Sequence, residues 1–312
     1  MIINNLEMKK GKLTKVNLNI TRLSSREIVD IPIKVSRSTK NGPTILLLGG
    51  IHGNEINGIE IVDRLSKDKS LKLLKGSIIF APIVNQYGYY NNNRYTFDGK
   101  DLNRSFPGNM KGSVSQKLAY KLANDLVPLA DIIIDFHTGG DQRTNYPQVR
   151  CSFRSEKQME LAKHFNQPLI VNAPLRDKSL RKLATQKKVP YLLFEGGKSL
   201  ERNKEIIDYG IEGTLNLLSK LKMIPTKKVT KHKSKLINSS SWERAEKTGL
   251  FKSFKQAGEI VRKGEILAEI KDDNGVIIEK ITAPTNGIVI GMEESNNITK
   301  GDALFHIGKV DN

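Results

Sequence analysis

The stretch ILLLGGIHGNE, residues 45–55, combines an apolar strand, a glycine turn and the polar start of a helix. Its first four residues are apolar without a break, which is typical of a strand buried on both faces of a sheet. Apolar residues then recur at helical spacing across residues 54–65. Because ligands of an open α/β sheet collect beyond the carboxyl ends of its strands, we expect His52 and Glu55 to lie at a functional site.

Similar strand and helix patterns extend in both directions from this stretch. Strands are expected at residues 13–36, 45–48, 77–84, 131–136 and 189–194, and helices at residues 54–65, 116–126, 157–165 and 201–222. A polar loop that is rich in aromatic residues spans residues 85–110. Continuous apolar strands that alternate with helices predict an α/β sheet covered by helices on both sides.

The composition changes after residue 225. Residues 226–241 are basic and rich in serine, which predicts an exposed linker between an α/β domain of residues 1–225 and a second domain of residues 242–312. The second domain shows only short strands, with a strong hairpin signal in the sequence DNG at residues 273–275. The phrase VRKGEIL at 261–267 recurs loosely as ITKGDAL at 298–304, which suggests a small pseudo-symmetric barrel or sandwich.

Those two phrases, with ITAPTNGIV between them, resemble the biotinyl/lipoyl carrier domains. Carriers of that kind attach their cofactor to a lysine at the tip of the central hairpin. Residues 272–276 form the corresponding tip here and contain no lysine, and Lys271 precedes the turn. We therefore expect this domain to have a structural or lid role rather than a carrier function.

Composition limits the classes of protein that the chain can belong to. It has 312 residues and one cysteine, Cys151, so no disulfide can form within it and a reducing compartment is expected. The N-terminus has no apolar run of signal-peptide length, and the longest apolar runs are strand-sized. These features predict a soluble, cytoplasmic protein without membrane segments.

The formal net charge of +18 indicates either a lysine-rich surface or an acidic partner. The lysines are spread along the whole chain, and the densest run, residues 227–235, falls in the predicted linker. No nucleic-acid-binding motif or aromatic-interleaved basic stripe is present. An acidic small molecule is the functional use of the charge that we favour, and we expect no nucleic-acid partner.

Two further predicted strands are also followed by residues that can bind a metal or transfer a proton. His137 follows the strand 131–136, and Glu195 follows the strand 189–194. His52, Glu55 and His137 make up two histidines and a carboxylate, the ligand set of a catalytic zinc that keeps one position open for water. Glu195 is a spare carboxylate that could act on that water, so the pattern favours a hydrolase.

Other candidate residues have weaker contexts. His164 lies on a polar helical segment, His232 lies in the basic linker, and His306 lies on a predicted strand of the second domain that at most reaches toward the site. Cys151 follows a predicted loop rather than a strand. The loop that contains Arg94 and residues 101–104 offers two arginines and an asparagine, which could be an anion clamp or solvated loop residues.

The motifs HGNE, R-x(6)-DLNR-x-FPG, D-x-HTGG and EGG occur in this order across residues 44–200. Together they resemble the succinylglutamate desuccinylase/aspartoacylase family, a branch of the zinc carboxypeptidase-like fold whose mixed sheet is flanked by helices, and an appended β-domain is also a feature of that family. The resemblance implies that His52, Glu55 and His137 bind one zinc ion. It further implies that Glu195 is the general base, that Asn103 and Arg104 hold a substrate carboxylate, and that Arg94 polarises the scissile carbonyl.

The resemblance thus implies a zinc-dependent amidohydrolase that cleaves a small acidic N-acyl amino acid. A zinc carboxypeptidase or deglutamylase that acts on an acidic peptide end would share all the motifs. A non-catalytic zinc-binding or carrier scaffold is the alternative from a different class. The acyl group, the amino acid and the oligomeric state stay open, and a homo-oligomer is compatible with the sequence.

Overall fold

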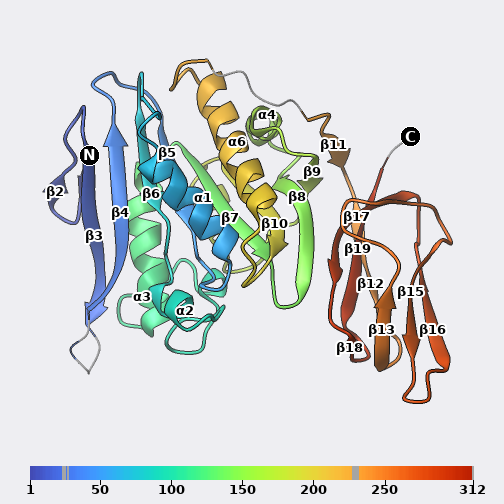
Figure 1. Ribbon diagram of the computed structural model, residues 1–312. Helices are drawn as coiled ribbons and strands as arrows, with labels where there is room; N and C mark the ends of the chain where they lie inside the picture. Colours follow the sequence, from blue (N-terminus) through green and yellow to red (C-terminus); the bar gives the residue numbers. More distant parts are fainter. Residues whose placement is uncertain (23–25, 27, 227–231, 311–312) are drawn as a thin grey trace.

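The computed structural model describes residues 1–22, 26, 28–226 and 232–310 (Figure 1). Within these residues, one 13-stranded mixed sheet dominates the molecule. Its main path runs β12 (Ser240–Arg244), β19 (Ala303–Lys309), β17 (Gly287–Glu293), β8 (Arg143–Cys151), β10 (Tyr191–Lys198), β7 (Ile132–Gly139), β5 (Thr44–Gly49), β6 (Ser77–Ala81), β4 (Ile28–Arg37) and β3 (Leu13–Arg22). Beside this path, β9 (Leu169–Asn172) pairs with β8 and β11 (Lys235–Ile237), and β14 (Ile260–Val261) pairs with β17.

The centre of the sheet is parallel and buried on both faces. Strands β6, β5, β7 and β10 are mutually parallel in that order, and every residue of β5, β6 and β7 is buried. Successive side chains of a strand point to opposite faces. Leu46 and Leu48 of β5 therefore enter one core cluster, whereas Ile45 and Leu47 enter the other.

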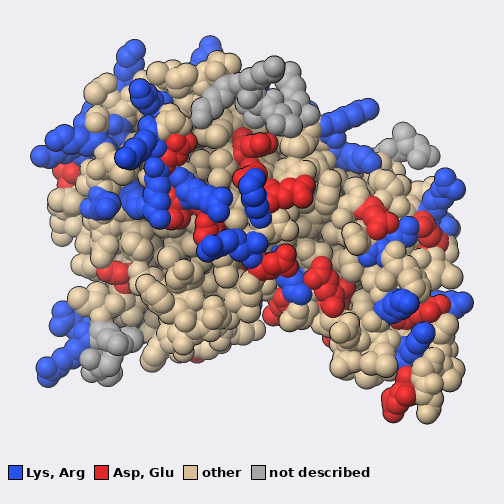
Figure 2. All heavy atoms as spheres, viewed as in Figure 1, with Lys and Arg blue, Asp and Glu red and all other residues tan. Residues whose placement is uncertain are grey.

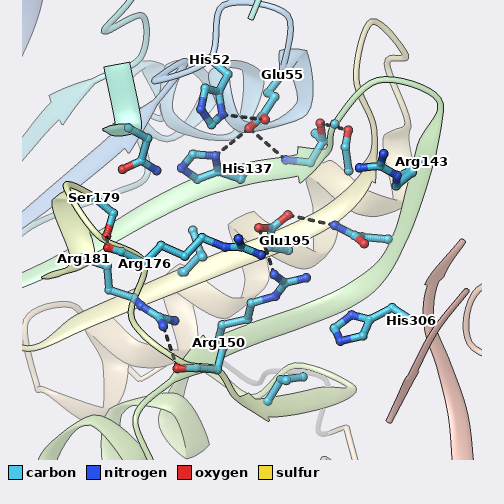
Figure 3. Close-up of a pocket in the computed structure, with 18 of the residues that line it drawn as sticks. His52, Glu55, His137, Arg143, Arg150, Arg176, Ser179, Arg181, Glu195 and His306 are labelled. Atoms are coloured by element: carbon cyan, nitrogen blue, oxygen red, sulfur yellow. Dashed lines mark hydrogen bonds and ion pairs between the residues drawn. The ribbon is translucent and has the colours of Figure 1, made fainter. Parts of the chain in front are cut away.

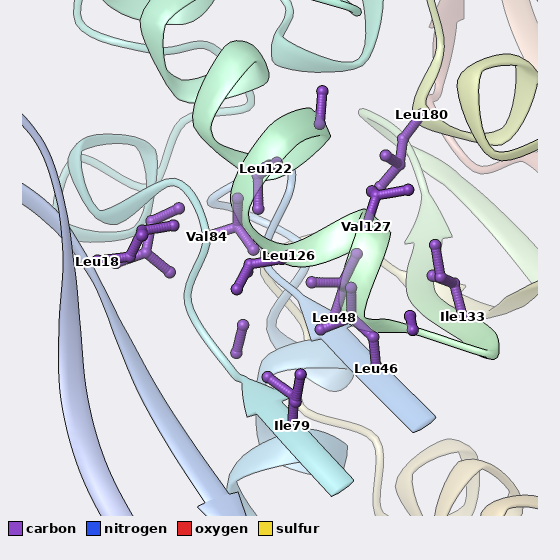
Figure 4. Close-up of a cluster of buried hydrophobic side chains, with 14 of the residues drawn as sticks. Leu18, Leu46, Leu48, Ile79, Val84, Leu122, Leu126, Val127, Ile133 and Leu180 are labelled. Carbon is purple, nitrogen blue, oxygen red and sulfur yellow. The ribbon is translucent and has the colours of Figure 1, made fainter. Parts of the chain in front are cut away.

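Helices cover both faces of this central sheet. The cluster that contains Ile45 is closed by α1 (Ile56–Lys67), α4 (Glu156–Phe165) and α6 (Lys204–Lys220). The opposite cluster is closed by α3 (Val114–Lys121), its π-helical extension η2 (Leu122–Leu126), η3 (Val127–Leu129) and α5 (Leu180–Gln186), and Figure 4 shows Leu46, Leu48 and Ile133 packed against that helical segment. Two short helices, α2 (Gln86–Tyr90) and η1 (Leu102–Arg104), lie in the long loop between β6 and α3, and β1 (Ile2–Ile3) pairs with β2 (Leu6–Glu7) at the N-terminus.

The expected strands and helices all occur, with shifted ends. Strands β7 and β10 continue three or four residues beyond the predicted ends, so that His137 and Glu195 lie inside these strands rather than after them. The helix expected at 116–126 is α-helical only to Lys121. The sequence patterns did not indicate β8, β9 or α5, and Cys151 is accordingly the last residue of a strand rather than a loop residue.

The C-terminal residues form additional antiparallel sheets, and a closed barrel is not confirmed. One is a four-stranded sheet in the order β16 (Ile277–Thr282), β15 (Ile266–Lys271), β13 (Gly249–Ser253) and β18 (Asn297–Ile298). The predicted hairpin is present, with Lys271 paired to Ile277. The other C-terminal strands extend the main sheet, because β17 pairs with β8. A separate apolar cluster lies between these two layers.

The predicted linker, residues 226–241, is only partly described, because residues 227–231 lie outside the described part of the chain. Within it, β11 pairs in parallel with β9 of the α/β part. Figure 2 shows Lys and Arg side chains on the α/β part and on the C-terminal part of the molecule, with Asp and Glu side chains among them. In the described residues, no helix is long and apolar enough to cross a membrane.

An aromatic cluster on the α1 face gives a test of this packing. Phe136, Phe165 and Phe194 are fully buried, with ring centroids 5.8–6.4 Å apart. We expect Phe165→Ala to lower the free energy of unfolding by about 3–5 kcal/mol, because it leaves a cavity between α4 and the sheet. Denaturant unfolding followed by circular dichroism measures this change. Leu250→Ala, at a side chain that is 50% exposed, is the control and should cost far less.

Candidate active site

The turn after β5 places the first two candidate residues. An added Cβ at Gly53 would lie 2.0 Å from the backbone of Gly88 and Tyr89, so only glycine lets this turn pack against α2. Glu55 is the N-cap residue of α1, one residue before the first helical turn in which we expected it. In this conformation His52 Nδ1 lies 2.8 Å from Glu55 Oε1.

His137 completes the predicted group from the neighbouring strand. Its Nδ1 lies 2.7 Å from Glu55 Oε2, and one possible ligand atom from each of His52, Glu55 and His137 lies within 4.8 Å of the others. All three side chains are buried. Figure 3 shows the two imidazoles converging on the one carboxylate.

The charges of this group are strongly coupled. Burial opposes ionisation of Glu55, but attraction to and hydrogen bonds with His52 and His137 hold the pKa of its carboxyl well below the usual value. Burial likewise opposes protonation of His137, but Asp135 and Glu55 raise the pKa of this imidazole well above its usual value. A buried anion between two imidazoles is an environment that a cation can neutralise.

The outer nitrogens of both imidazoles are also held by carboxylates. His137 Nε2 lies 2.9 Å from Asp135 Oδ2, and His52 Nε2 lies 3.1 Å from Asp101 Oδ1. Asp135 also accepts a hydrogen bond from the hydroxyl of Tyr191. Metal-binding histidines are typically oriented in this way, with the second nitrogen bonded to a carboxylate. The residues present therefore fit a metal ion that is bound through both Nδ1 atoms and Glu55.

The loop between β6 and α3 folds back onto this group. Arg94 donates from Nε and Nη2 to Asp101 Oδ2, at 3.2 and 2.9 Å, and its Nη1 lies 3.3 Å from Glu55 Oε1. Burial opposes ionisation of Asp101, but His52 and Arg94 hold the pKa of this carboxyl well below its usual value. Arg94 is thus placed beside the His–Glu–His group, as the order of motifs implied.

Asn103 and Arg104 lie on η1, at the edge of the same cavity. Asn103 Oδ1 accepts a hydrogen bond of 2.9 Å from the backbone N–H of Leu180, at the start of α5. The oxygen of the amide is therefore occupied, and its NH₂ group remains as a donor. Arg104 is exposed as a residue, but its guanidinium is partly buried at the cavity. This partial burial, together with Arg176 and Arg94, lowers the pKa of the guanidinium despite the attraction of Asp101.

Glu195 lies next to His137 in the parallel register of β10 and β7. Its Oε2 accepts a hydrogen bond of 2.9 Å from Asn145 Nδ2, and its Oε1 lies 3.7 Å from Arg150 Nη1. Figure 3 shows its carboxylate between the His–Glu–His group and a group of arginines. The structure therefore brings all seven predicted residues to one cavity.

This cavity has a volume of about 560 Å³ and a strongly basic wall. Six arginines and three carboxylates line it among the described residues, namely Arg94, Arg104, Arg143, Arg150, Arg176 and Arg181 against Glu55, Asp141 and Glu195. Four of the arginines were not indicated by the sequence patterns. They lie on β8, on the loop after β9 or on α5, and the sequence patterns indicated none of these elements.

The C-terminal strands contribute Ser240, Trp242 and His306 to the cavity wall. The ring of His306 is stacked on Trp242, with centroids 4.7 Å apart, and its Nε2 lies 2.8 Å from Ser240 Oγ. Burial, together with Arg150 and Arg176, lowers the pKa of this imidazole to about 3, so it is neutral near pH 7. The expectation that His306 at most reaches toward the site thus understates its place in the wall.

The remaining candidates lie outside the cavity lining. Cys151 is buried at the end of β8, where burial raises the pKa of its thiol to about 11. A thiol with a raised pKa is a poor metal ligand, because metal binding requires the thiolate. His164 is half-buried on α4, and the ring of His232 packs against Tyr209, with centroids 5.0 Å apart.

Known proteins resemble this chain in sequence and in fold. The curated Nα-acetyl-L-2,4-diaminobutyric acid deacetylase of Halomonas elongata is 28% identical over an alignment of 298 residues, and the match covers 90% of this chain and 86% of that protein. The product-bound ectoine utilization protein EutE (DoeB) of Ruegeria pomeroyi has the same fold, with a TM-score of 0.87, 22% identity and coverage of 96% of this chain and 97% of that one. A succinylglutamate desuccinylase/aspartoacylase of Rhodobacter sphaeroides gives a TM-score of 0.87 at 25% identity, covering 98% of both chains.

A family match spans more than half of the chain. Residues 41–221, which contain all seven predicted site residues, match the succinylglutamate desuccinylase/aspartoacylase catalytic domain. The fold and the order of the motifs agree with this match. The chain belongs to the succinylglutamate desuccinylase/aspartoacylase family.

Proposed function

We propose that the protein is a zinc-dependent amidohydrolase that cleaves a small acidic N-acyl amino acid into a carboxylate and a free amino acid. The observation that carries this proposal is the buried His52–Glu55–His137 group with Glu195 beside it in one basic cavity. Family membership and the amide-cleaving activity named for the Halomonas relative support it. The proposed machinery lies in a catalytic domain of residues 1–225, and the cavity wall is completed by Ser240 and by Trp242 and His306 of a second domain of residues 242–312.

In this proposal, His52 and His137 hold one zinc ion through Nδ1, and Glu55 holds it through its carboxylate. When bound, zinc supplies a Lewis acid that makes water a nucleophile near neutral pH. The hydrogen bonds to Asp101 and Asp135 keep both Nδ1 atoms turned toward Glu55. The protein thus pays little to organise these ligands when the ion binds, because the rings are already oriented.

The remaining chemistry is assigned to protein side chains. Glu195 accepts the proton of the water as its oxygen attacks the amide carbon, and then donates that proton to the leaving amine. Arg94, beside the same group, donates hydrogen bonds to the oxyanion that develops on the carbonyl oxygen. Removal of one such donor typically lowers the rate on the order of 100- to 1000-fold.

The excess of arginines over carboxylates in the wall supports an acidic substrate. Arg104 and the free NH₂ group of Asn103 are proposed to hold the carboxylate beside the scissile amide, since a guanidinium binds a carboxylate through two parallel hydrogen bonds. A cavity of about 560 Å³ is in the size range of small-molecule sites. A carboxypeptidase that acts on an acidic peptide end would use the same residues, and the glutamyl peptides of the substrate panel below separate that activity from deacylation. A non-catalytic scaffold would not need Glu195 and Arg94 at the cavity.

The metal assignment predicts that His52→Ala abolishes zinc binding and activity together. Loss of one of three ligands also leaves Glu55 with one imidazole fewer to stabilise its charge. Zinc content of the purified, zinc-loaded protein, measured by atomic emission, tests this prediction. His232→Ala, outside the cavity, should retain one zinc per chain. One full equivalent of zinc in the His52→Ala protein would contradict the assignment.

The assignment of the base predicts that Glu195→Gln keeps zinc and thermal stability but loses kcat by roughly 100- to 10,000-fold, because the amide cannot take the proton. Steady-state kinetics beside zinc content and Tm separate these effects. Glu294→Gln, at an exposed residue, is the matched control. A near-normal kcat in the Glu195→Gln enzyme would show that this carboxylate is structural.

The carboxylate clamp predicts a loss that depends on the substrate. Arg104→Ala should lower kcat/KM by roughly 100-fold or more on substrates with a free carboxylate, because the substrate charge is left unpaired. On an amide-capped analogue, which the normal enzyme already cleaves poorly, the change should be small. Arg202→Ala, which is exposed and pairs with Glu60, is the control.

A panel of N-acetyl, N-succinyl and N-acyl-aspartate compounds with glutamyl peptides supplies the substrates for this comparison. Equal losses on free and capped substrates would reject the clamp. If the zinc-loaded normal protein cleaves no member of the panel, the proposed function itself is rejected.

A further inference from the structure

The carboxylate of Glu195 is held by one close hydrogen bond, and its donor comes from β8, the strand that pairs with β10. Asn145 Nδ2 lies 2.9 Å from Glu195 Oε2, whereas the guanidinium of Arg150 lies 3.7 Å from Oε1, beyond ordinary hydrogen-bond length. Asn145 is buried on β8 and lines the cavity. The orientation of Glu195 therefore depends on where this amide is held.

A β-bulge in β8 turns Asn145 toward the cavity. Glu195 is paired with Gln148, but Gly197, two residues on, is paired with Asn145, three residues back. The extra residue in β8 lies next to Pro147, which has no N–H for the ladder and is common at bulges. Without the extra residue, the side chain of Tyr146 would lie on the same face of the sheet as Glu195. The bulge places Asn145 on that face instead, and Tyr146 packs on an apolar cluster that includes Ile290.

The other neighbour of Asn145 is a glycine of the C-terminal region. Gly291 on β17 is the register partner of Asn145, and a Cβ added there would lie 2.3 Å from Asn145 Oδ1. Gly291 is not among the glycines with positive φ, so its backbone would accept alanine. The next atom, the carbonyl oxygen of Thr144, would lie 3.0 Å away, so the severe conflict is with the side chain of Asn145.

We propose that β17 of the C-terminal region orients the base: Gly291 leaves the space in which Asn145 holds Oε2 of Glu195. Gly291 and Asn145 are positioning residues in this view, and Gly291 acts only through Asn145. Fixing Oε2 leaves Oε1 as the oxygen that takes the proton, and small errors in such geometry cost much of the rate. As a statement about catalysis, this inference rests on the proposed function of Glu195.

The first test requires no substrate. In a crystal structure of the Gly291→Ala protein, we expect the distance from Asn145 Nδ2 to Glu195 Oε2 to exceed 3.5 Å, because the added methyl group displaces the amide. Ile290→Val, which loosens the neighbouring residue of the same strand without reaching Asn145, should keep the bond. An intact hydrogen bond in the Gly291→Ala structure would overturn the proposal.

The second test is a double-mutant cycle measured on the best substrate of the panel. Gly291→Ala and Asn145→Ala should each lower kcat roughly 10- to 100-fold, with zinc content and Tm close to normal and little change in KM for Gly291→Ala. Gly291→Ala should add no further loss in the Asn145→Ala background, because the group that it displaces is already absent.

Additive losses would overturn the proposal, since Gly291 would then act through Thr144 or through the fold. An unchanged kcat in the Gly291→Ala enzyme with a broken hydrogen bond would overturn it as well. If neither the normal protein nor Ile290→Val cleaves any panel member, the proposed function fails. The crystal structure still decides in that case whether Gly291 sets the orientation of Glu195.

Discussion

The shared carboxylate of Glu55 is the interaction on which the site depends. Its Oε1 lies 2.8 Å from His52 Nδ1, and its Oε2 lies 2.7 Å from His137 Nδ1 and 3.2 Å from the backbone nitrogen of Thr138. A buried carboxylate is very unfavourable unless it is paired and hydrogen-bonded. The turn after β5 and the end of β7 must therefore meet at this residue. An added Cβ at Gly58 would lie 2.3 Å from the carbonyl oxygen of Phe136, so glycine allows α1 to approach β7 closely enough for that contact.

The continuous sheet gives the C-terminal region a direct part in the cavity. Pairing of β17 with β8 places His306 and Trp242 in the wall, and it places Gly291 against Asn145. The strand β8 at this junction also adds positive charge to the wall, because it carries Arg143 and Arg150. A cavity with this charge attracts anions and holds them more firmly than an exposed surface would, since less solvent screens the interaction.

The predictions from the sequence agree best with the structure where a segment contains an apolar run or a motif of its own. The central strands have uninterrupted apolar runs, and the motifs around His52, Arg94 and His137 adjoin them, so both the sheet and the grouping of these residues could be predicted. Strand β8, RTNYPQVRC, mixes polar residues with a proline and contains a bulge, so no period-2 pattern marks it. Arg150 and Asn145 were missed for that reason, and Arg181 because α5 has only seven residues, too few to show a clear helical repeat.

The sequence by itself determined the α/β order of the chain. It also determined that four residues lie together at one edge of the sheet, namely His52, Glu55, His137 and Glu195. These features are encoded within short segments, and parallel strands bring their carboxyl ends together by geometry alone. Only the tertiary structure decided that β8 runs antiparallel between β10 and β17, and that Asn145 rather than Tyr146 faces Glu195. Residues 145, 195 and 291 meet only because their strands pair in a register that contains a bulge. These strands are distant in the sequence, and their register is set by tertiary packing, which a local sequence pattern does not reveal.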